Sequence, residues 1–583
     1  MLKVSNYDRR PRIQIPGDDC AVGWDEIISV LLSRIGGGKF LLCVECYPGT
    51  PTYEIAKQLQ ASLHPALFVR TEKLFRPEDE INELLDPYLG TDPVFGRMNP
   101  IEISDFFDRE LLSRQRQLVE SQRDGLILLI GPGASLLSEA VDLLVLAELT
   151  RWNIQQLQRG NAIGNLGLPN KNESPGQKYK RAFFVDWRSA DRLKLKLFPR
   201  IDFLLDMNES EQPKMISGAD YRRALESVTR RPFRVVPFFD PGPWGGQWMK
   251  HTFQLPENQP NYAWCFDCVP EENSLLLGFG QHSVEVPALD LVLLHPLELL
   301  GPKIFKEFGA EFPIRFDFLD TMEGGNLSLQ VHPLRSYIAE HFGIPYTQDE
   351  SYYILDRGEG SIVYLGVKDG IDREEMAAAL RTAQEGGAPF EAERFVNTWP
   401  SRKHDHFSVP GGTVHCSGRN NVVLEISATP FIFTFKLWDW GRMGLDGKPR
   451  PIHLDHGLAN IQWNRTSGWV RDHLFNKNEF VAAGTGWREE RTGVHHASFL
   501  ETRRHWFTGV VCHDTRNTVN VLNLVEGDEV IVESPDSKFD PFVVHYAETF
   551  IVPASVGRYN IRPSRQTGKE YATIKAFVRN AEI

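Results

Sequence analysis

The sequence predicts a multidomain protein in which an α/β domain precedes two all-β domains. Its 583 residues are too many for one hydrophobic core. Residues 1–210 alternate short aliphatic runs with longer amphipathic stretches, which is the pattern of a parallel sheet with crossover helices. Later segments, above all beyond residue 449, alternate apolar and polar residues as antiparallel strands do. We expect domains at 1–210, 237–448 and 449–583, with a linker at 211–236.

Five aliphatic runs predict the strands of the α/β domain. Continuous apolar runs are typical of parallel strands that are covered on both faces. The runs are 39–46, 66–69, 126–131, 142–149 and 201–207. A stretch rich in lysine and arginine occupies residues 175–200, and its charges fit a solvated face as well as they fit a phosphate-binding role.

A glycine-bearing turn follows the first of these strands, in VECYPGTPTYEIAKQL at 44–59. This segment faintly resembles the P-loop of nucleoside kinases of the uridine-kinase kind. A working P-loop needs a lysine and a hydroxyl after its last glycine, but Gly49 is followed by Thr50 and Pro51. We therefore expect a degenerate kinase-like domain that transfers no phosphate and serves as a scaffold or ligand sensor. A second turn, GPGASLL at 131–137, could still receive an anion through its backbone amides.

Four potential ligands for one divalent metal lie in the first all-β domain. Gln330 and His332 are two residues apart in an apolar run, so on a strand both side chains project from one face. Glu350 stands in DESYYIL, and His415 follows the glycine-rich turn of VPGGTVH. Two imidazoles, one carboxylate and one amide oxygen suit Zn²⁺ or another first-row ion, one per chain. A lone strand histidine is more often structural, but this ordered combination is a cupin-type signature.

The same motifs resemble the type I mannose-6-phosphate isomerases, zinc-dependent cupin enzymes that interconvert mannose 6-phosphate and fructose 6-phosphate. The resemblance spans about residues 237–450. It implies a metal-dependent aldose–ketose isomerase whose ligands are Gln330, His332, Glu350 and His415. The landmarks that carry it are PWGG at 243–246, FPIRFDFLD at 312–320, LSLQVHP at 327–333, ESYYIL at 350–355, VPGGTVH at 409–415, VVLEIS at 422–427 and LWDWGR at 437–442.

Two positions depart from this family. Where the family usually has a lysine, in the strand before the metal-binding one, this chain has Asp317. Where the family usually has an arginine, shortly before the terminal DW, it has Lys436. The first change reverses a charge, and the second loses the planar fork that suits phosphate. The natural sugar, and whether it is phosphorylated, therefore stay open.

Isomerisation of a sugar needs a base near the carbon-bound proton and an electrophile for the enediolate oxygen. A metal would be the electrophile. Glu425, which lies ten residues beyond His415, is the candidate for acid–base exchange, and by resemblance it matches an acidic family residue near the reacting carbons. Lys436 and Arg442 are candidates for catalysis and for contacts with sugar or phosphate oxygens. Trp244 could stack on a sugar face, although tryptophan is more often buried.

The last domain contains an internal repeat of the first all-β domain. FSVPGGTVHCSG at 407–418 aligns with FIVPASVGRYNI at 550–561, which puts Arg558 where His415 stands. We expect residues 449–583 to form a second cupin domain that lacks the metal ligands.

The amino-acid composition limits the kinds of binding partner that we expect. The formal net charge of −13, from 77 acidic and 64 basic residues, argues against a nucleic acid or an anionic membrane. No run approaches ~18 apolar residues, and the first residues lack the apolar core of a signal peptide, so we expect a cytoplasmic protein. Seven scattered cysteines do not form a disulfide framework. The expected partner is a small sugar or sugar phosphate, and the sequence leaves the oligomeric state undetermined.

Two other functions stay open. The degenerate P-loop and the changes at Asp317 and Lys436 would also fit a non-catalytic, carbohydrate-sensing cupin protein. Two histidines and a carboxylate would also serve iron in a cupin oxygenase, although the amide of Gln330 weighs against it.

Overall fold

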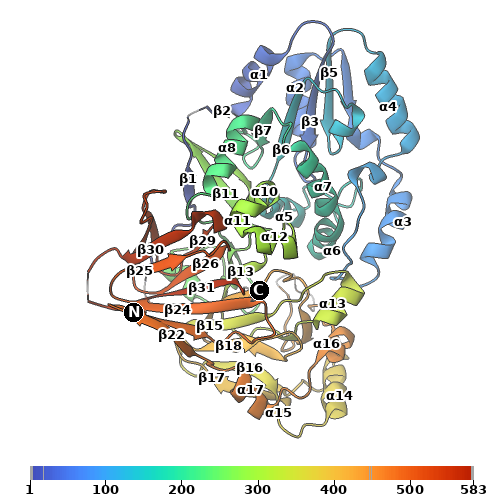
Figure 1. Ribbon diagram of the computed structural model, residues 1–583. Helices are drawn as coiled ribbons and strands as arrows, with labels where there is room; N and C mark the ends of the chain where they lie inside the picture. Colours follow the sequence, from blue (N-terminus) through green and yellow to red (C-terminus); the bar gives the residue numbers. More distant parts are fainter. Residues whose placement is uncertain (1–3, 18, 445–446, 448–449, 567, 580–583) are drawn as a thin grey trace. The chain divides into compact units, whose positions relative to one another are not determined.

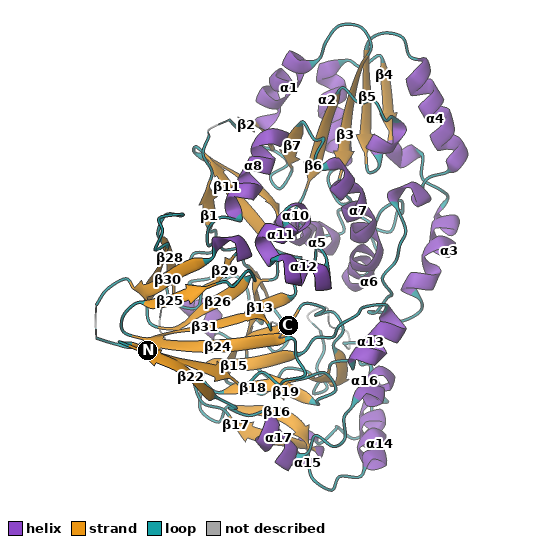
Figure 2. Cartoon of the chain, viewed as in Figure 1, coloured by secondary structure: helices purple, strands orange, loops and turns teal. Residues whose placement is uncertain are grey.

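The computed structural model describes residues 4–17, 19–444, 447, 450–566 and 568–579, and it contains two compact units (Figure 1). The α/β unit comprises residues 12–227 and 274–294, and the β unit comprises 1–11, 228–273 and 295–583. Helices gather in the α/β unit and strands dominate the β unit (Figure 2). No helix of the described ranges combines the length and the apolar character needed to cross a membrane.

The α/β unit is built on a seven-stranded sheet in the order β2-β8-β7-β6-β3-β5-β4. All five aliphatic runs form the parallel part of this sheet, as predicted. Most of their side chains are buried, although in the edge strand β4 only Val69 is. The strands are β2 (Ala21–Val22), β3 (Phe40–Cys46), β4 (Leu67–Arg70), β5 (Leu126–Gly131), β6 (Leu143–Glu148), β7 (Phe203–Asp206) and β8 (Lys214–Ser217).

Nine helices of this unit lie among its described residues. They are α1 (Gly23–Arg34), α2 (Thr52–Leu63), α3 (Glu78–Leu89), α4 (Arg109–Ser121), α5 (Arg151–Arg159), α6 (Pro175–Arg181), α7 (Trp187–Leu197), α8 (Gly218–Val228) and α10 (Ala288–Leu294). A small sheet of β1 (Arg12–Gln14), β11 (Ser274–Phe279) and β12 (His282–Pro287) completes the unit. The segment 211–236, expected to be a linker, contains β8 and α8.

The basic stretch at 175–200 has a role that the sequence did not reveal. Lys178 donates to the carbonyl oxygen of Lys171 at 2.6 Å, and Lys194 pairs with Glu148 at 2.7 Å and with Asp290. These lysines are buried inside the unit. These two lysines therefore neither form a solvated face nor contact a phosphate. Each makes buried contacts with other residues of the α/β unit.

The β unit contains two pairs of antiparallel sheets. In the first pair, a six-stranded sheet has the order β18-β15-β20-β13-β10-β9, and a five-stranded sheet has the order β17-β16-β19-β14-β21. The strands are β9 (Phe238–Asp240), β10 (Trp264–Cys268), β13 (Ile314–Asp320), β14 (Leu329–Val331), β15 (Glu350–Arg357), β16 (Ile362–Val367), β17 (Val396–Pro400), β18 (His406–Val409), β19 (His415–Ser417), β20 (Asn421–Ala428) and β21 (Phe435–Trp438).

The second pair consists of a six-stranded sheet, β22-β23-β24-β31-β26-β29, and a four-stranded sheet, β25-β30-β27-β28. Apolar side chains such as Phe507, Leu522 and Tyr559 fill the space between them. The strands are β22 (Glu479–Gly484), β23 (Trp487–Thr492), β24 (Leu500–Phe507), β25 (Val511–Asp514), β26 (Asn520–Glu526), β27 (Glu529–Glu533), β28 (Phe542–His545), β29 (Thr549–Val552), β30 (Arg558–Pro563) and β31 (Tyr571–Val578).

Short helices connect the strands of the β unit. They are α9 (Trp248–Thr252), α11 (Pro296–Leu300), α12 (Pro302–Phe308), α13 (Arg335–Phe342), α14 (Arg373–Gln384), α15 (Ala392–Phe395), α16 (Leu454–Asn460) and α17 (Ser467–His473).

Candidate metal centre

Three ligand-type side chains converge inside the first pair of sheets. The ligand atoms of His332, Glu350 and His415 all lie within 4.8 Å of one another, and all three residues are buried. His415 begins β19 and pairs with Gln330 of β14, while Glu350 begins β15 in the facing sheet. His332 directly follows β14 and therefore shares the face of Gln330. The two sheets thus bring all four predicted ligands to one place.

The distances show one carboxylate held between two imidazoles. Glu350 Oε2 lies 3.0 Å from His332 Nε2, and Glu350 Oε1 lies 2.9 Å from His415 Nε2. The other ring nitrogens contact backbone carbonyl oxygens, His332 Nδ1 at 3.3 Å and His415 Nδ1 at 2.8 Å. Because a carbonyl oxygen can only accept, each Nδ1 carries a hydrogen, and each Nε2 is the ring atom that faces the centre.

The buried atoms of this cluster fit a cation. His332 Nε2 and Glu350 Oε1 make no hydrogen bond to any described residue, although both are buried. Buried polar atoms normally have a partner, and a metal ion bound between them would supply it. The amide of Gln330 lies 3.2 Å from His415 Nε2, and exchanging its nitrogen and oxygen would present an oxygen to the same point. The donor set therefore suits Zn²⁺ or a similar ion.

Glu425 lies beside this cluster on β20. It pairs across the sheet with Asp317 of β13 on one side and with Tyr352 of β15 on the other. Its Oε1 accepts hydrogen bonds from Arg315 at 2.6 Å and from Gln348 at 3.1 Å. Gln348 also donates to Glu350 Oε2 at 3.2 Å, so one amide links Glu425 to the candidate ligands.

Burial and neighbouring charges shift the pKa values of these carboxyl groups in opposite directions. Burial, together with Asp317 and Glu350, raises the pKa of Glu425 well above its ordinary range. Burial also raises the pKa of Asp317 to about 7, against the opposing effect of Arg315. For Glu350, burial acts in the same sense, but the two imidazoles outweigh it and leave the pKa below its ordinary value. Glu350 is therefore ionised under conditions in which Glu425 holds a proton.

Sequence reasoning missed two residues here, Arg315 and Gln348. Arg315 donates to Asp317 at 2.8 Å as well as to Glu425, so it places a buried cation on the face where the family's lysine would stand. The signal was present in the sequence, because Arg315 and Asp317 alternate within an apolar strand and must share a face. Gln348 likewise stands two residues before Glu350.

Lys436 lies next to the cluster, whereas Arg442 and Trp244 are engaged elsewhere. Lys436 on β21 pairs with Gln330, and burial, helped by Arg450 and Arg442, lowers its pKa to about 8. Arg442 pairs with Asp439 at 2.7 Å. Trp244 is buried and packs edge-on against Trp264, with ring centroids 4.8 Å apart. Among the described residues, neither Arg442 nor Trp244 makes a recorded contact with the four candidate ligands.

In the α/β unit, the second glycine turn already holds a carboxyl group that belongs to the chain, and burial raises the pKa of this group to about 7. Glu45 Oε1 accepts a hydrogen bond from the Gly133 amide at 2.5 Å, and Glu45 Oε2 accepts one from the Ser135 amide at 2.9 Å. These amides, which the sequence left available to an external ligand, are therefore occupied by a buried carboxyl group.

Comparison with known proteins finds similarity in two parts of the chain. Residues 23–230 match a family described as a domain of unknown function, DUF8485. The mannose-6-phosphate isomerase of Streptococcus mutans is 24% identical over 233 residues, which cover 39% of this chain and 68% of that protein. The mannose-6-phosphate isomerase ManA of Bacillus subtilis is 27% identical over 241 residues, 40% of this chain and 69% of that protein.

Similar solved structures are also described as mannose 6-phosphate or phosphomannose isomerases. The crystal structure of the mannose 6-phosphate isomerase from Bacillus subtilis is 17% identical, with a TM-score of 0.49 over 59% of this chain and 99% of that chain. A variant of the phosphomannose isomerase from Salmonella typhimurium is 14% identical, with a TM-score of 0.46 over 60% of this chain and 99% of that chain.

Proposed function

We propose that the first pair of sheets is the active site of a metal-dependent aldose–ketose isomerase acting on mannose 6-phosphate or a related sugar or sugar phosphate. The observation that carries the proposal is the convergence of His332, Glu350 and His415 with ligand atoms that lack hydrogen-bond partners. The names of the relatives, at 24% and 27% identity, support the class of reaction and substrate.

In this proposal, Gln330, His332, Glu350 and His415 hold one Zn²⁺ or other divalent first-row ion per chain. When bound, the ion supplies positive charge that stabilises negative charge developing on the sugar oxygens. Burial between the two sheets excludes bulk water from the reacting carbons, which strengthens every charge interaction in the site.

Glu425 moves the proton between the two neighbouring carbons of the sugar. Its three recorded hydrogen bonds, from Arg315, Gln348 and Ser427, all end on Oε1. Among the described residues, none is recorded to Oε2, so that oxygen can face the substrate. Burial raises the pKa of Glu425 well above its ordinary range, so the carboxyl group holds a proton more readily than an exposed glutamate does.

Lys436 is the proposed contact with a sugar oxygen or phosphate, because it lies next to Gln330 and its pKa of about 8 keeps it charged near neutral pH. Arg442 and Trp244 stay predictions, since contact with substrate would require each to leave its present partner.

For the α/β unit we propose a kinase-like domain that transfers no phosphate. The parallel order β7-β6-β3-β5-β4, with the Gly49 turn directly after β3, supports the likeness. The absent lysine and the internal Glu45 argue against catalysis. We also propose that residues 449–583 form a second cupin domain without metal, since His332, Glu350 and His415 are the one candidate cluster among the described residues.

The test compares the full-length protein with His332→Ala and with His251→Ala, a matched control at an exposed histidine of the same unit. Elemental analysis should give one metal equivalent for the unsubstituted protein and the control, and far less for His332→Ala. Turnover of mannose 6-phosphate should be retained in the control and lost in His332→Ala together with the metal. Two equivalents per chain would contradict the ligand assignment.

The same experiment separates the alternative functions. Saturable binding of mannose 6-phosphate or mannose without turnover of either would favour a carbohydrate sensor. Iron as the bound metal, with oxygen consumption, would favour an oxygenase.

A further inference from the structure

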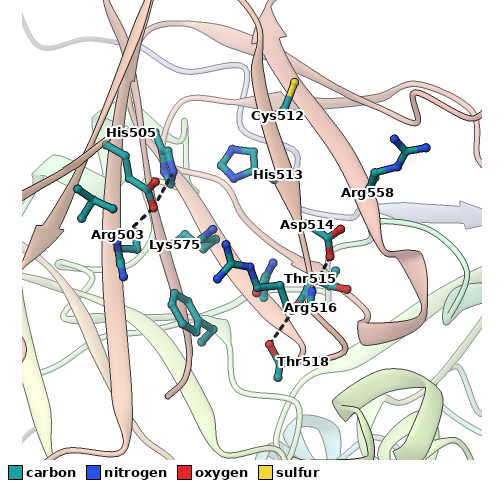
Figure 3. Close-up of a pocket in the computed structure, with 14 residues that line it drawn as sticks. Arg503, His505, Cys512, His513, Asp514, Thr515, Arg516, Thr518, Arg558 and Lys575 are labelled. Atoms are coloured by element: carbon teal, nitrogen blue, oxygen red, sulfur yellow. Dashed lines mark hydrogen bonds and ion pairs between the residues drawn. The ribbon is translucent and has the colours of Figure 1, made fainter. Parts of the chain in front are cut away.

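The second pair of sheets contains a cavity of about 440 Å³ that the proposed isomerase does not use. Its lining comes from both sheets: Arg503 and His505 on β24 and Lys575 on β31 face His513 on β25 and the turn that carries Arg516. Figure 3 shows Arg503, His505 and Lys575 on one side, with His513 and Arg516 beside them. A cavity of this size accommodates a small organic ligand.

The lining carries four cations and two carboxylates, Glu489 and Asp514, so it has an excess of positive charge. Two of the cations have direct ion pairs: Arg503 with Glu501 and Glu489, and Arg558 with Asp536 at 2.7 Å. The other two, Lys575 and Arg516, make no direct ion pair with any described residue, although the carboxylate of Glu489 attracts Lys575. Lys575 lies directly opposite Arg503 in the register of β24 and β31, so two cations stand side by side. Such an arrangement costs free energy unless an anion joins it.

Two buried imidazoles belong to the lining of the same space. His505 is 2% exposed and His513 is 6% exposed, and their rings meet edge to face at 4.5 Å. Neither His505 Nδ1 nor His513 Nε2 has a hydrogen-bond partner among the described residues. Buried nitrogens normally have a hydrogen-bond partner, so the two imidazoles add polar groups to the charged lining of the cavity.

The cavity lies at a strand that takes part in the internal repeat between residues 407–418 and 550–561. Arg558, which begins β30 and lines the cavity, stands where His415 begins β19 in the first pair of sheets. The second pair of sheets thus has a polar, cationic cavity beside the strand that corresponds to β19, where the first pair carries a candidate metal ligand.

We propose that this cavity is a binding site for a small phosphomonoester, with the phosphate held by Lys575 and Arg516 and the remaining polar groups of the ligand held by His505 and His513. A dianion offsets the repulsion among the cations, and the hydroxyl groups of an attached polyol satisfy the two imidazoles. The site is independent of the candidate metal centre.

Isothermal titration calorimetry of the full-length protein tests the proposal. The probes are inorganic phosphate and glycerol 3-phosphate, with glycerol as the uncharged comparison. Both phosphates should bind saturably and glycerol should not. Binding should persist in His332→Ala, which separates this site from the metal centre.

Two substitutions locate the site. Lys575→Met and Arg516→Gln should each weaken phosphate binding by about tenfold or more, the usual effect of removing a charged hydrogen-bond donor. Lys538→Met, at an exposed lysine of the same pair of sheets, should change nothing. Arg516 is exposed, so its replacement is informative even if Lys575→Met fails to fold. Absence of saturable phosphate binding, or unchanged affinity in both pocket variants, would overturn the proposal.

Discussion

The two pairs of sheets in the β unit share an antiparallel design but treat buried charge in opposite ways. In the first pair, Arg315 is shared between two carboxylates, and Glu350 is shared between two imidazoles, so each charge has a partner. In the second pair, Lys575 and Arg516 make no direct ion pair among the described residues, and the groups recorded near Lys575 include the carboxylate of Glu489 and the ring of Phe577. The contrast teaches that two similar pairs of sheets can differ in how their inward-facing charges are paired.

The largest expected effect concerns the buried ion pairs of Arg315 in the first pair of sheets. Arg315→Met removes the cation that Asp317 and Glu425 share and leaves two buried acids without it. Breaking a buried pair in this way costs about 3–5 kcal/mol of unfolding free energy. Chemical denaturation measures it, with Arg419→Met, at an exposed arginine of the same unit, as the control.

A double variant sharpens that result. Arg315→Met combined with Glu425→Gln should recover part of the lost stability, because the second change removes one of the unpaired acids. If Arg315→Met is as stable as the control, the buried ion pairs do not matter for folding.

The second prediction concerns the chemistry of the first pair. Glu425→Gln should retain the metal and lower turnover by roughly 10²-fold or more, the usual contribution of an acid–base group. Steady-state kinetics and elemental analysis on the same preparation measure both. Glu359→Gln, at an exposed glutamate, is the control. Unchanged turnover in Glu425→Gln would remove this residue from the mechanism.

The third prediction concerns how acid pH changes the stability of the second pair of sheets. Burial lowers the pKa of His505 to about 4, against the weaker opposing effect of Glu489. The unfolded chain, with a histidine pKa near 6.5, therefore binds more protons than the folded chain between about pH 6.5 and pH 4, so stability falls as the pH falls through this window.

His505→Gln removes the titrating group and should reduce the loss of unfolding free energy between pH 7 and pH 5 by about 2 kcal/mol. Denaturation curves at the two pH values measure the difference. An equal loss in the variant and in the unsubstituted protein would show that His505 does not titrate in this way.

The smallest expected effect concerns Lys436. Lys436→Ala should raise KM about tenfold with little change in kcat, because the lysine is proposed to bind substrate rather than to transfer a proton. Lys436→Arg should favour the phosphorylated sugar, since arginine presents two parallel donors. Kinetics with mannose 6-phosphate and mannose decide between a phosphate contact and a hydroxyl contact, and a fall in kcat alone would contradict both.

The sequence was a good guide wherever a local pattern determined the structure. The five aliphatic runs predicted the parallel strands because burial on both faces leaves a continuous apolar signature. The spacing of Gln330 and His332 predicted a shared face because side chains alternate along a strand.

What the sequence did not reveal depends on pairings between distant segments. Arg315 meets Glu425 only because β13 lies beside β20 in one particular register, which no local pattern encodes. In the same way, the basic stretch at 175–200 fitted a solvated face and a phosphate-binding role equally well, and only the fold shows that Lys194 meets Glu148 and Asp290 inside the α/β unit.

The carboxyl group of Glu45 has a consequence for how the α/β unit could change. Glu45 accepts hydrogen bonds from the Gly133 and Ser135 amides, so it occupies the two donors that an external anion would need at this turn. An incoming phosphate would have to displace Glu45, whose pKa burial raises to about 7, so the carboxyl group is partly ionised near neutral pH. A lysine introduced after Gly49 would stand at the other glycine turn and would leave Glu45 in place. Phosphate binding at the 131–137 turn would therefore require the replacement of Glu45 itself.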